Sequence, residues 1–145
     1  MIKDRFRGYL PIIVDVETAG FNCQTDALLE AAAVIIDMDD DGLLYAKETI
    51  DCHIEPFAGA NLEAAALEFT GIDPADPERE AISERDALDQ LFKPIRKALK
   101  ANECKRAILV GHNAAFDLNF INAAVVRCQP KRNPFHPFSC FDKAT

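Results

Sequence analysis

The sequence lacks an apolar run of the length needed to cross a membrane, which is about 20 residues for a helix. The basic residues Lys3, Arg5 and Arg7 are not followed by an uninterrupted apolar segment, so we expect no secretion signal. Repeats and low-complexity segments are also missing. These absences exclude membrane-spanning and repeat proteins. The 145 residues, 49% of them hydrophobic, predict one soluble cytoplasmic domain over residues 1–145.

Paired cysteines are absent as well. The five cysteines are an odd number, they are widely spaced, and none belongs to a Cys-x-x-Cys pair. We therefore predict neither a zinc site nor a disulfide framework, and free thiols suit a reducing cytoplasm. The five are Cys23, Cys52, Cys104, Cys128 and Cys140.

A net positive charge is missing too, because the formal net charge is -8. This argues against a nucleic-acid partner, since phosphate contacts draw on Lys and Arg. However, twelve of the sixteen basic residues are clustered, and charge alone leaves a nucleic-acid surface and ordinary solvated helix faces equally open. The clusters are Lys3, Arg5 and Arg7; Lys93, Arg96, Lys97, Lys100, Lys105 and Arg106; and Arg127, Lys131 and Arg132.

The sequence does contain two acidic motifs, each after a short apolar run. Asp-Val-Glu-Thr begins at Asp15, and Gly-His-Asn-Ala-Ala-Phe-Asp ends at Asp117. On a strand, residues two apart point to the same face, so Asp15 and Glu17 are predicted to point together. Asp117 is expected at a strand-to-helix junction, where the helix dipole alone would also favour an acid.

An Asp-x-Glu triplet is weak evidence by itself, because a second one begins at Asp76 in a proline-rich loop. Asp15 and Glu17 differ because they end a buried-looking strand, where unpaired charges are costly unless they bind a metal. If residues 12–14 and 108–110 form neighbouring strands, both motifs meet at one edge of the sheet. Carboxylates suit Mg²⁺, and two such ions can clamp the oxygens of a phosphodiester displacement.

Apolar periodicity and turn residues predict an α/β domain with a mixed sheet flanked by helices. Residues 28–38 fit a helix or a strand, and the turn at 39–42 favours a strand paired with 48–54. The other predicted elements are a helix over 62–69 capped by Asn61, a helix from Ser83 to Lys100 kinked at Pro94, a strand over 107–110, a helix over 116–127, and a loop over 129–138.

The two acidic motifs resemble the first two motifs of the DEDD exonucleases, which have a ribonuclease-H-like fold. Other segments resemble the ribonuclease T family, and the resemblance covers essentially the whole chain. The segment Asn-Pro-Phe-His-Pro-Phe argues against the alternative of an oligoribonuclease or proofreading exonuclease. The matching segments begin at Asp4 (Asp-Arg-Phe-Arg-Gly), Thr25 (Thr-Asp-Ala-Leu-Leu-Glu), Gly71 (Gly-Ile-Asp-Pro) and Lys131 (Lys-Arg-Asn-Pro-Phe-His-Pro-Phe).

The resemblance implies a 3′-5′ exoribonuclease that trims single-stranded 3′ ends of stable RNAs, in tRNA end turnover and in rRNA and small RNA maturation, and that also degrades single-stranded DNA. It implies catalysis with two Mg²⁺ ions, or Mn²⁺, and a homodimer in which a basic patch guides RNA into the partner's active site. The metal ligands would be Asp15, Glu17 and Asp117. The residues that stack on bases would be Phe21, Phe69, Phe116 and Phe138, and the alternative is that these phenylalanines belong to the core. The basic patch would consist of Arg5, Arg7, Lys100, Arg106 and Lys131.

The sequence departs from the family in two places. An acidic position beside the stacking helix is Ala65, which bears on terminal-base preference. The third motif, with a His general base and a fourth Asp, is expected downstream of Thr145, and Asp142 is interpreted as structural. None of His53, His112 and His136 has the spacing to replace that base. We expect the chain to be the N-terminal portion of a longer enzyme, to lack the final helices and to be inactive alone. The alternative is a natural, catalytically inactive module that binds nucleic acid or metal.

Overall fold

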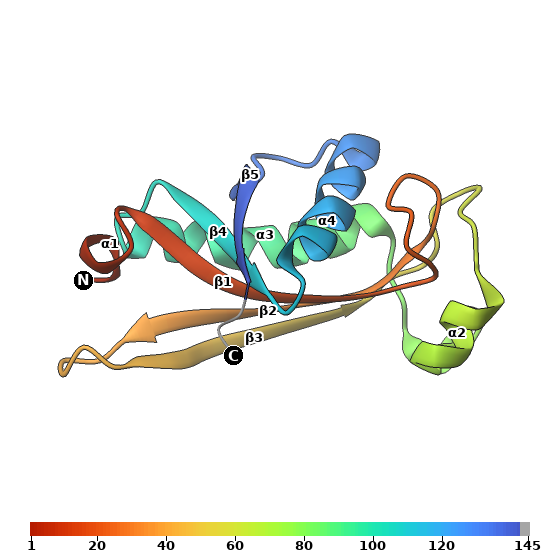
Figure 1. Cartoon of the computed structure of the whole chain (residues 1–145), viewed down its shortest axis with the longest axis horizontal. Coiled ribbons are helices and arrows are strands. Elements are labelled where there is room, and N and C mark those ends of the chain that lie inside the picture. The colour runs from red at the N-terminus through yellow and green to blue at the C-terminus, as the bar shows by residue number, and fades with distance from the viewer. Residues whose placement is uncertain (143–145) are drawn as a thin grey trace.

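In the computed structural model, which describes residues 1–142, five strands form one mixed sheet in the order β3-β2-β1-β4-β5 (Figure 1). The pairs β1–β2 and β2–β3 are antiparallel, whereas β1–β4 and β4–β5 are parallel. This confirms the predicted α/β class with a mixed sheet. The strands are β1 (Tyr9–Thr18), β2 (Leu28–Met38), β3 (Leu44–His53), β4 (Arg106–Gly111) and β5 (Phe135–Asp142).

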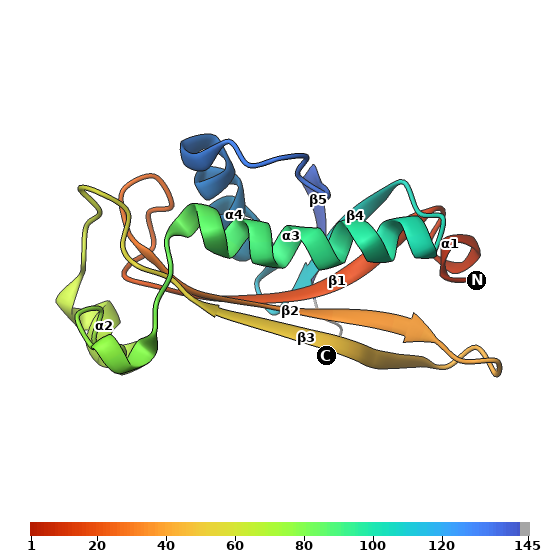
Figure 2. The same ribbon diagram turned by 180° about the vertical axis from the view of Figure 1, so that it is seen from behind.

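Two long helices pack on the sheet. The helix α3 runs alongside β2 and β3 and contacts β4, and α4 contacts β1, β4 and β5 (Figure 2). None of the helices in residues 1–142 is both long enough and apolar enough to cross a membrane. The helices are α1 (Ile2–Arg5), α2 (Ala64–Thr70), α3 (Glu84–Ala101) and α4 (Ala114–Cys128), with a 3₁₀ turn, η1 (Pro77–Arg79).

Alternation along β1 separates the core from the acidic side chains. Val14 and Val16 are buried, while Asp15 between them is exposed and Glu17 is half-buried. The buried side chains of β1 join the apolar faces of α3 and α4 in one cluster. The side chains of Asp15 and Glu17 therefore lie on the face of the sheet opposite to this core. The core includes Leu10, Ile12, Val14, Val16, Leu88, Leu91, Phe92, Ile95, Phe120 and Ile121.

Most predicted elements are confirmed, with shifted ends. Residues 28–38 form the strand β2, and the Ser83 hydroxyl accepts a hydrogen bond from the Asp86 amide as a helix cap should. The helix α3 continues through Pro94 to Ala101. The prediction that Asn61 caps α2 is wrong: the cap residue is Glu63, because the Asn61 side chain is bound to another segment.

The predicted loop over residues 129–138 is also wrong in its second half, because β5 begins at Phe135. The Phe135 side chain is 2% exposed and packs edge-on against Phe92 with ring centroids 6.1 Å apart. Burial of this ring and parallel pairing with β4 override the local proline signal. An edge strand tolerates Pro137, because the backbone N–H that proline lacks can be one that would point away from the neighbouring strand.

Candidate active site

The fold brings the three predicted carboxylates to one edge of the sheet. Strands β1 and β4 are parallel with Ile13 opposite Val110, so their carboxyl ends lie side by side. Asp15 and Glu17 project from β1, and Asp117 lies in the first turn of α4, directly after β4. The Val16 amide donates a hydrogen bond of 3.0 Å to Asp117 Oδ1, which joins the two motifs.

Gly111 makes the close approach of Asp117 possible. A Cβ atom at this position would lie 3.0 Å from Asp117 Oδ2 and 3.2 Å from the Val14 carbonyl oxygen. A side chain at these distances would force the neighbouring atoms to shift by a few tenths of an ångström. The glycine that opens the second motif therefore favours close packing of the carboxylate against β1.

The carboxylates influence one another electrostatically. Asp117 is 5% exposed, and this burial raises its pKa to about 6; the Val16 amide opposes the shift, and the charges of Asp15 and Glu17 add to it. The pKa of Glu17 is raised by burial and by the nearby Asp15 and Glu30. Such a group of like charges favours either a bound proton or a bound cation.

The donor set fits a hard divalent cation, because all three groups offer carboxylate oxygens. Asp117 is buried with its raised pKa, which is the situation that a cation relieves. In residues 1–142, however, no three His, Cys, Asp or Glu side chains are arranged as a ready metal cluster. The chemistry of the site therefore fits Mg²⁺ or Mn²⁺, and the assignment of Asp15, Glu17 and Asp117 as ligands stays a prediction.

A row of acidic and imidazole side chains extends the site across the sheet. Glu17 is opposite Glu30 of β2, and Glu30 is opposite His53 of β3. His53 Nδ1 lies 3.1 Å from Glu30 Oε1. Spacing in the sequence excluded His53 from the site, whereas the sheet register places it two strands from Glu17.

Asp142 and His136 have hydrogen-bond partners, whereas His112 is exposed. Asp142 Oδ1 accepts a hydrogen bond of 3.1 Å from the Ala114 amide at the start of α4, which fits its interpretation as structural. His136 Nδ1 accepts from the amides of Phe138 and Ser139.

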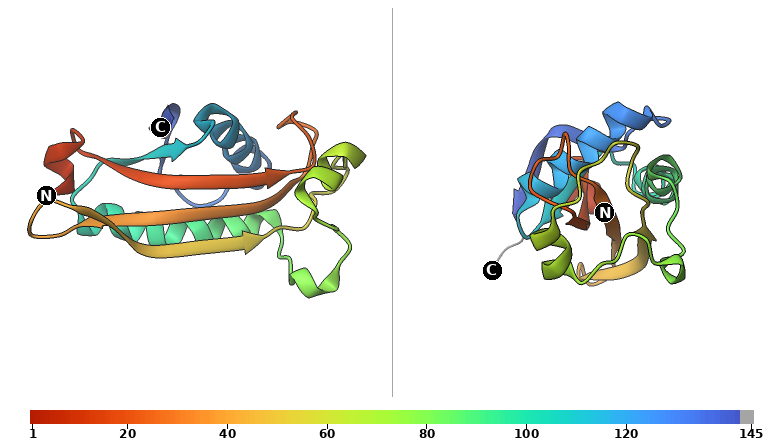
Figure 3. Two further views of the ribbon diagram at one scale, coloured as in Figure 1. Left: turned by 60° about the horizontal axis from the view of Figure 1, so that its bottom comes forward. Right: turned by 90° about the vertical axis from the view of Figure 1, so that its right-hand side faces the viewer.

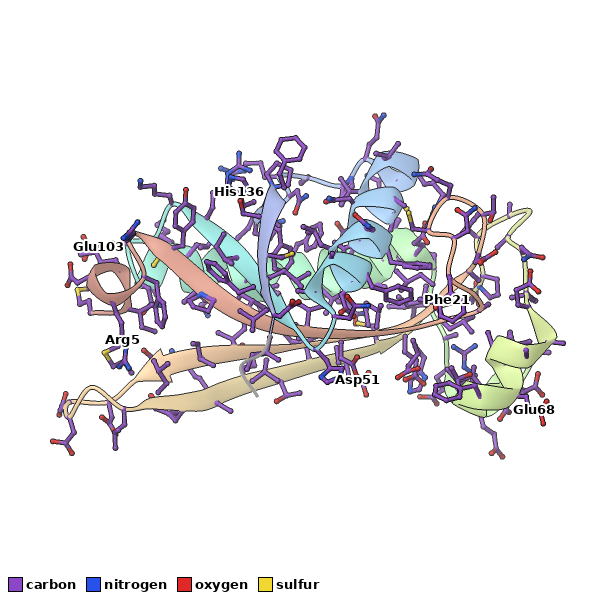
Figure 4. The ribbon with its side chains drawn as sticks, viewed as in Figure 1. Arg5, Phe21, Asp51, Glu68, Glu103 and His136 are labelled. Carbon is purple, nitrogen blue, oxygen red and sulfur yellow. The ribbon has the colours of Figure 1, made fainter. Side chains whose placement is uncertain are left out.

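Three of the four predicted stacking residues line one cavity next to the carboxylates. This cavity, of about 760 Å³, is lined by Glu17, Phe21, Phe69 and Phe116 among others. Phe21 is 92% exposed and Phe69 is 90% exposed, so neither is a core residue. Phe116 is partly buried against Phe120, 4.9 Å away, and contacts Phe21 edge-on. Figure 4 shows Phe21 on the loop after β1, on the side facing α2.

Phe138 lies elsewhere. It is 88% exposed and lines a second groove, of about 660 Å³, together with Arg5, Arg7, Tyr9 and His136. The structure thus separates Phe138 from the other three phenylalanines and places it beside two predicted patch residues.

The basic patch residues other than Lys131 lie toward the end of the sheet far from the carboxylates. Arg5 ends α1, Lys100 lies in the last turn of α3, and Arg106 begins β4; Figures 1 and 2 show α1, the C-terminal end of α3 and the start of β4 at the same end of the molecule. Arg5 also donates to the Gly42 carbonyl in the β2–β3 turn, 2.8 Å away, so the acidic residues of that turn lie nearby. Exposed Lys131 follows α4, and its carbonyl accepts from Arg96 of α3.

Sequence reasoning missed Asp26. This carboxylate is 4% exposed and lines the same cavity as Phe21 and Phe69. Its position directly before a run of buried apolar residues was a usable signal, since a buried acid needs partners. Those partners come from a distant segment that the sequence does not identify.

The exonuclease family designated RNase T matches residues 12–145 of the chain. Among curated relatives, the ribonuclease T of Hahella chejuensis is 66% identical over 141 residues, which is 97% of this chain and 65% of the relative. The ribonuclease T of Marinobacter nauticus is 63% identical over 99% of the chain and 65% of its own length. The chain thus spans about 65% of the length of these two relatives.

Solved structures of lower identity share the fold. Escherichia coli exonuclease I in complex with a dT13 oligonucleotide has a TM-score of 0.67 and 18% identity, over 92% of this chain and 28% of that one. A product-bound structure of exonuclease I has a TM-score of 0.66, also at 18% identity, over 92% of this chain and 30% of that one. At this identity the similarity shows that the chain shares the fold of exonuclease I, and nothing finer.

Proposed function

The chain belongs to the ribonuclease T exonuclease family, and we propose that it forms the catalytic domain of a 3′-5′ exoribonuclease acting on single-stranded ends. One observation carries the proposal: Glu17, from the carboxylate group, lines the same cavity as the exposed Phe21 and Phe69. Aromatic rings outside the core can stack on unpaired bases, and carboxylates beside them are placed to act on the adjoining phosphodiester.

The residues of the site divide the reaction between binding and chemistry. Phe21, Phe69 and Phe116 would hold the terminal bases, each stack contributing about 1–3 kcal/mol. Asp15, Glu17 and Asp117 would hold Mg²⁺ or Mn²⁺, two ions in the complete enzyme, which would neutralise phosphate charge and activate a water. Stacking does not read base edges, so the cavity is expected to select single strands without selecting a particular base sequence. Single-stranded DNA is therefore a second expected substrate.

The basic residues support a homodimer. Tyr9 lines the groove beside Arg5 and Arg7, and Glu17 lines the cavity. They are eight residues apart on β1, which corresponds to roughly 26 Å at about 3.3 Å per residue. At this distance the groove cannot contact a terminal nucleotide that is bound in the cavity of the same chain. We propose that the groove, with Phe138, contacts RNA that enters the site of a second copy.

Family membership supports a proposal for the biological setting. We propose that the substrates are the 3′ ends of stable RNAs, in tRNA end turnover and in rRNA and small RNA maturation, in the cytoplasm. Ala65 lines the cavity at the position where the family resemblance places an acid, so terminal-base preference is expected to differ from that pattern.

The proposal is tested by an exonuclease assay. The purified chain and a chimera that continues into the C-terminal third of the Hahella chejuensis relative are incubated with a 3′-labelled single-stranded RNA and Mg²⁺. We expect mononucleotide release by the chimera and essentially none by the 145-residue chain, because a positioned base is worth about 10²–10⁴ in rate. The family resemblance places that base beyond the residues of this chain.

Matched variants make the assay specific. Asp15→Asn in the chimera should abolish release, whereas Asp76→Asn, in the other Asp-x-Glu triplet, should leave it intact. Release that persists in the Asp15→Asn chimera would contradict the assigned site. A chimera that binds RNA but never cleaves it would instead support the alternative of a catalytically dead binding module.

A further inference from the structure

Two segments far apart in the sequence form the walls of the aromatic cavity. The loop after β1 carries Phe21, and α2 with its preceding loop carries Phe69. Figure 3 shows this loop and α2 together at one end of the sheet. Both rings are almost fully exposed, and the edge-on contact of Phe21 with Phe116, at 6.3 Å between ring centroids, gives the pair little packing of its own. The width of the gap between them must therefore be set by whatever joins the two segments.

Asp26 joins them through its side chain. Its Oδ1 accepts a hydrogen bond of 2.9 Å from the Asn61 side-chain amide, which belongs to the segment before α2. Its Oδ2 accepts a hydrogen bond of 2.9 Å from the Asn22 backbone amide, one residue after Phe21. Thr25 Oγ1 donates to Oδ1 at 3.1 Å. One buried carboxylate thus accepts hydrogen bonds both from Asn22, the neighbour of Phe21, and from Asn61, in the segment that leads to Phe69.

Backbone bonds follow the same junction. The Asn61 amide donates to the Thr25 carbonyl at 2.7 Å, and the Ala27 amide donates to the Asn61 carbonyl at 3.1 Å. The Glu63 amide, at the cap of α2, donates to the Ala19 carbonyl at 2.9 Å. The two bonds of Asn61 form a short parallel bridge between Asp26 and Asn61, and the Glu63 bond lies beside it. We call this set of contacts the Asp26 clasp.

Gly20 leaves the space that the Asp26 carboxylate occupies. A Cβ atom on Gly20 would lie 2.0 Å from Asp26 Oδ2, a distance that no side chain can adopt without displacing the carboxylate. The carboxylate therefore packs directly against the backbone that precedes Phe21. Burial alone would raise the pKa of Asp26, but the bonds from Asn61, Asn22 and Thr25 outweigh it and keep the pKa below its ordinary value. The group is consequently charged at neutral pH and bonds its donors strongly.

We propose that Asp26 is a positioning residue that sets the gap between Phe21 and Phe69 and thereby controls the stacking of the terminal base. This inference rests on the proposed function, since it assumes that a base enters the cavity. It adds a residue that acts through the two aromatic walls. Asn61 and Gly20 belong to the same device.

The first test measures the clasp without nucleic acid. Hydrogen exchange by NMR compares Asp26→Asn and Asn61→Ala with the matched control Asp76→Asn, whose side chain only accepts from the Glu78 amide. We expect exchange at the Asn61 and Glu63 amides to accelerate about tenfold in the first two variants, as loss of a charge-assisted bond predicts. Asn61 is exposed, and Asn61→Ala removes the donor to Asp26 together with the 2.6 Å bond from the same amide to Glu63 Oε1, so it remains informative at the Asn61 amide if Asp26→Asn folds poorly. Unchanged exchange in both would overturn the clasp.

The second test measures stacking. A single-stranded oligonucleotide with 2-aminopurine at its 3′ end is titrated in EDTA, and quenching of its fluorescence reports stacking. Asp26→Asn and Phe69→Ala should each weaken binding about tenfold, the equivalent of one lost stack. If Asp26 acts through the rings, adding Asp26→Asn to Phe69→Ala should cause little further loss.

The outcomes separate the two proposals. Additive losses in the double variant would overturn the positioning role, because a purely structural residue weakens both backgrounds equally. If Asp26→Asn quenched the 2-aminopurine fluorescence as strongly as the unmodified chain does, while its amide exchange was accelerated, the positioning role would also be overturned. Absence of quenching by the unmodified chain would count against the proposed base contact itself, and hydrogen exchange would then decide the clasp alone.

Discussion

Asp15 and Asp76 each begin an Asp-x-Glu triplet, but their surroundings differ. Asp76 Oδ1 accepts from the Glu78 amide and caps η1, whereas Asp15 stands on β1 beside Glu17 and the buried Asp117. We expect Asp15→Asn to weaken Mn²⁺ binding by at least the roughly tenfold that loss of an outer-shell partner causes. Asp76→Asn should leave binding unchanged. Isothermal titration calorimetry checks both, and equal affinity of Asp15→Asn and the unmodified chain would refute the metal assignment.

Asp117 should make the metal-free chain less stable as the pH rises. Its pKa is about 6 in the folded chain against an ordinary 3.8, so the folded state holds this proton more tightly than the unfolded chain does. The contribution to the unfolding free energy is therefore largest below about pH 3.8, falls between about 3.8 and 6, and stays low above that range. Burial is the main cause of the raised pKa, and the charges of Asp15 and Glu17 add to it.

Asp117→Asn removes this charge, while an amide oxygen can still accept from Val16. In EDTA at pH 7 we expect the variant to unfold with a free energy on the order of 2–3 kcal/mol above that of the unmodified chain. The gain should shrink toward pH 4. Urea unfolding at both pH values, with Asp76→Asn as control, measures this. A variant less stable than the unmodified chain at pH 7 would show that the buried charge is already compensated.

Between elements, one ion pair joins α3 to α4. Arg127 donates two hydrogen bonds of 2.8 Å to the buried Glu84 carboxylate, stacks on Phe57, and donates to the Cys23 carbonyl in the loop after β1. Arg127→Ala would leave Glu84 buried and unpaired, which costs about 3–5 kcal/mol. Lys47, paired with Asp37 at 3.5 Å on the surface, is the control, and its removal should cost less than about 1 kcal/mol.

Urea denaturation of the two variants checks this expectation. The double variant Glu84→Ala with Arg127→Ala should be more stable than Arg127→Ala alone, because it no longer buries an unpaired charge. Equal losses for Arg127→Ala and Lys47→Ala would mean that the helices are held by their apolar contacts alone.

Elements also show where local sequence patterns fail. The bounds of β2 follow from its apolar run and the turn after it, both of which are local. In contrast, β5 depends on the exposed edge of β4 and on space for Phe135 beside Phe92, two features of distant segments. Asn61 was predicted as a helix cap from its neighbours, but it bonds Asp26, which is 35 residues away in the sequence.

For the whole molecule, the overall charge of -8 and the basic end of the sheet make opposite predictions about RNA. We expect local charge to prevail. Changing the patch to Ala should weaken single-strand binding and flatten its salt dependence, by about 0.7 in log–log slope for each lost phosphate contact. The patch comprises Arg5, Arg7, Lys100, Arg106 and Lys131.

Fluorescence anisotropy of a labelled single strand at several salt concentrations measures the slope. Phe21→Ala is the control, because it should weaken binding without changing the slope. An unaltered slope in the five-residue variant would mean that these charges do not contact phosphate. Sedimentation of the same variants would report whether a second copy is bound.

By itself, the sequence determined the α/β class, most helices and strands, the family, and the convergence of Asp15, Glu17 and Asp117. These follow from short-range rules: residues two apart share a strand face, and motifs at the ends of parallel strands meet at one edge. Exposure of Phe21 and Phe69, in contrast, could not be distinguished from burial by sequence pattern.

Only the tertiary structure decided the arrangement around those carboxylates. It brought His53 into the row with Glu17, separated Phe138 from the other rings, and buried Asp26 between two loops. Each of these depends on sheet register or on contacts between segments tens of residues apart. A local pattern specifies which face a side chain takes, but its neighbour across the sheet or cavity is set by how the whole chain packs.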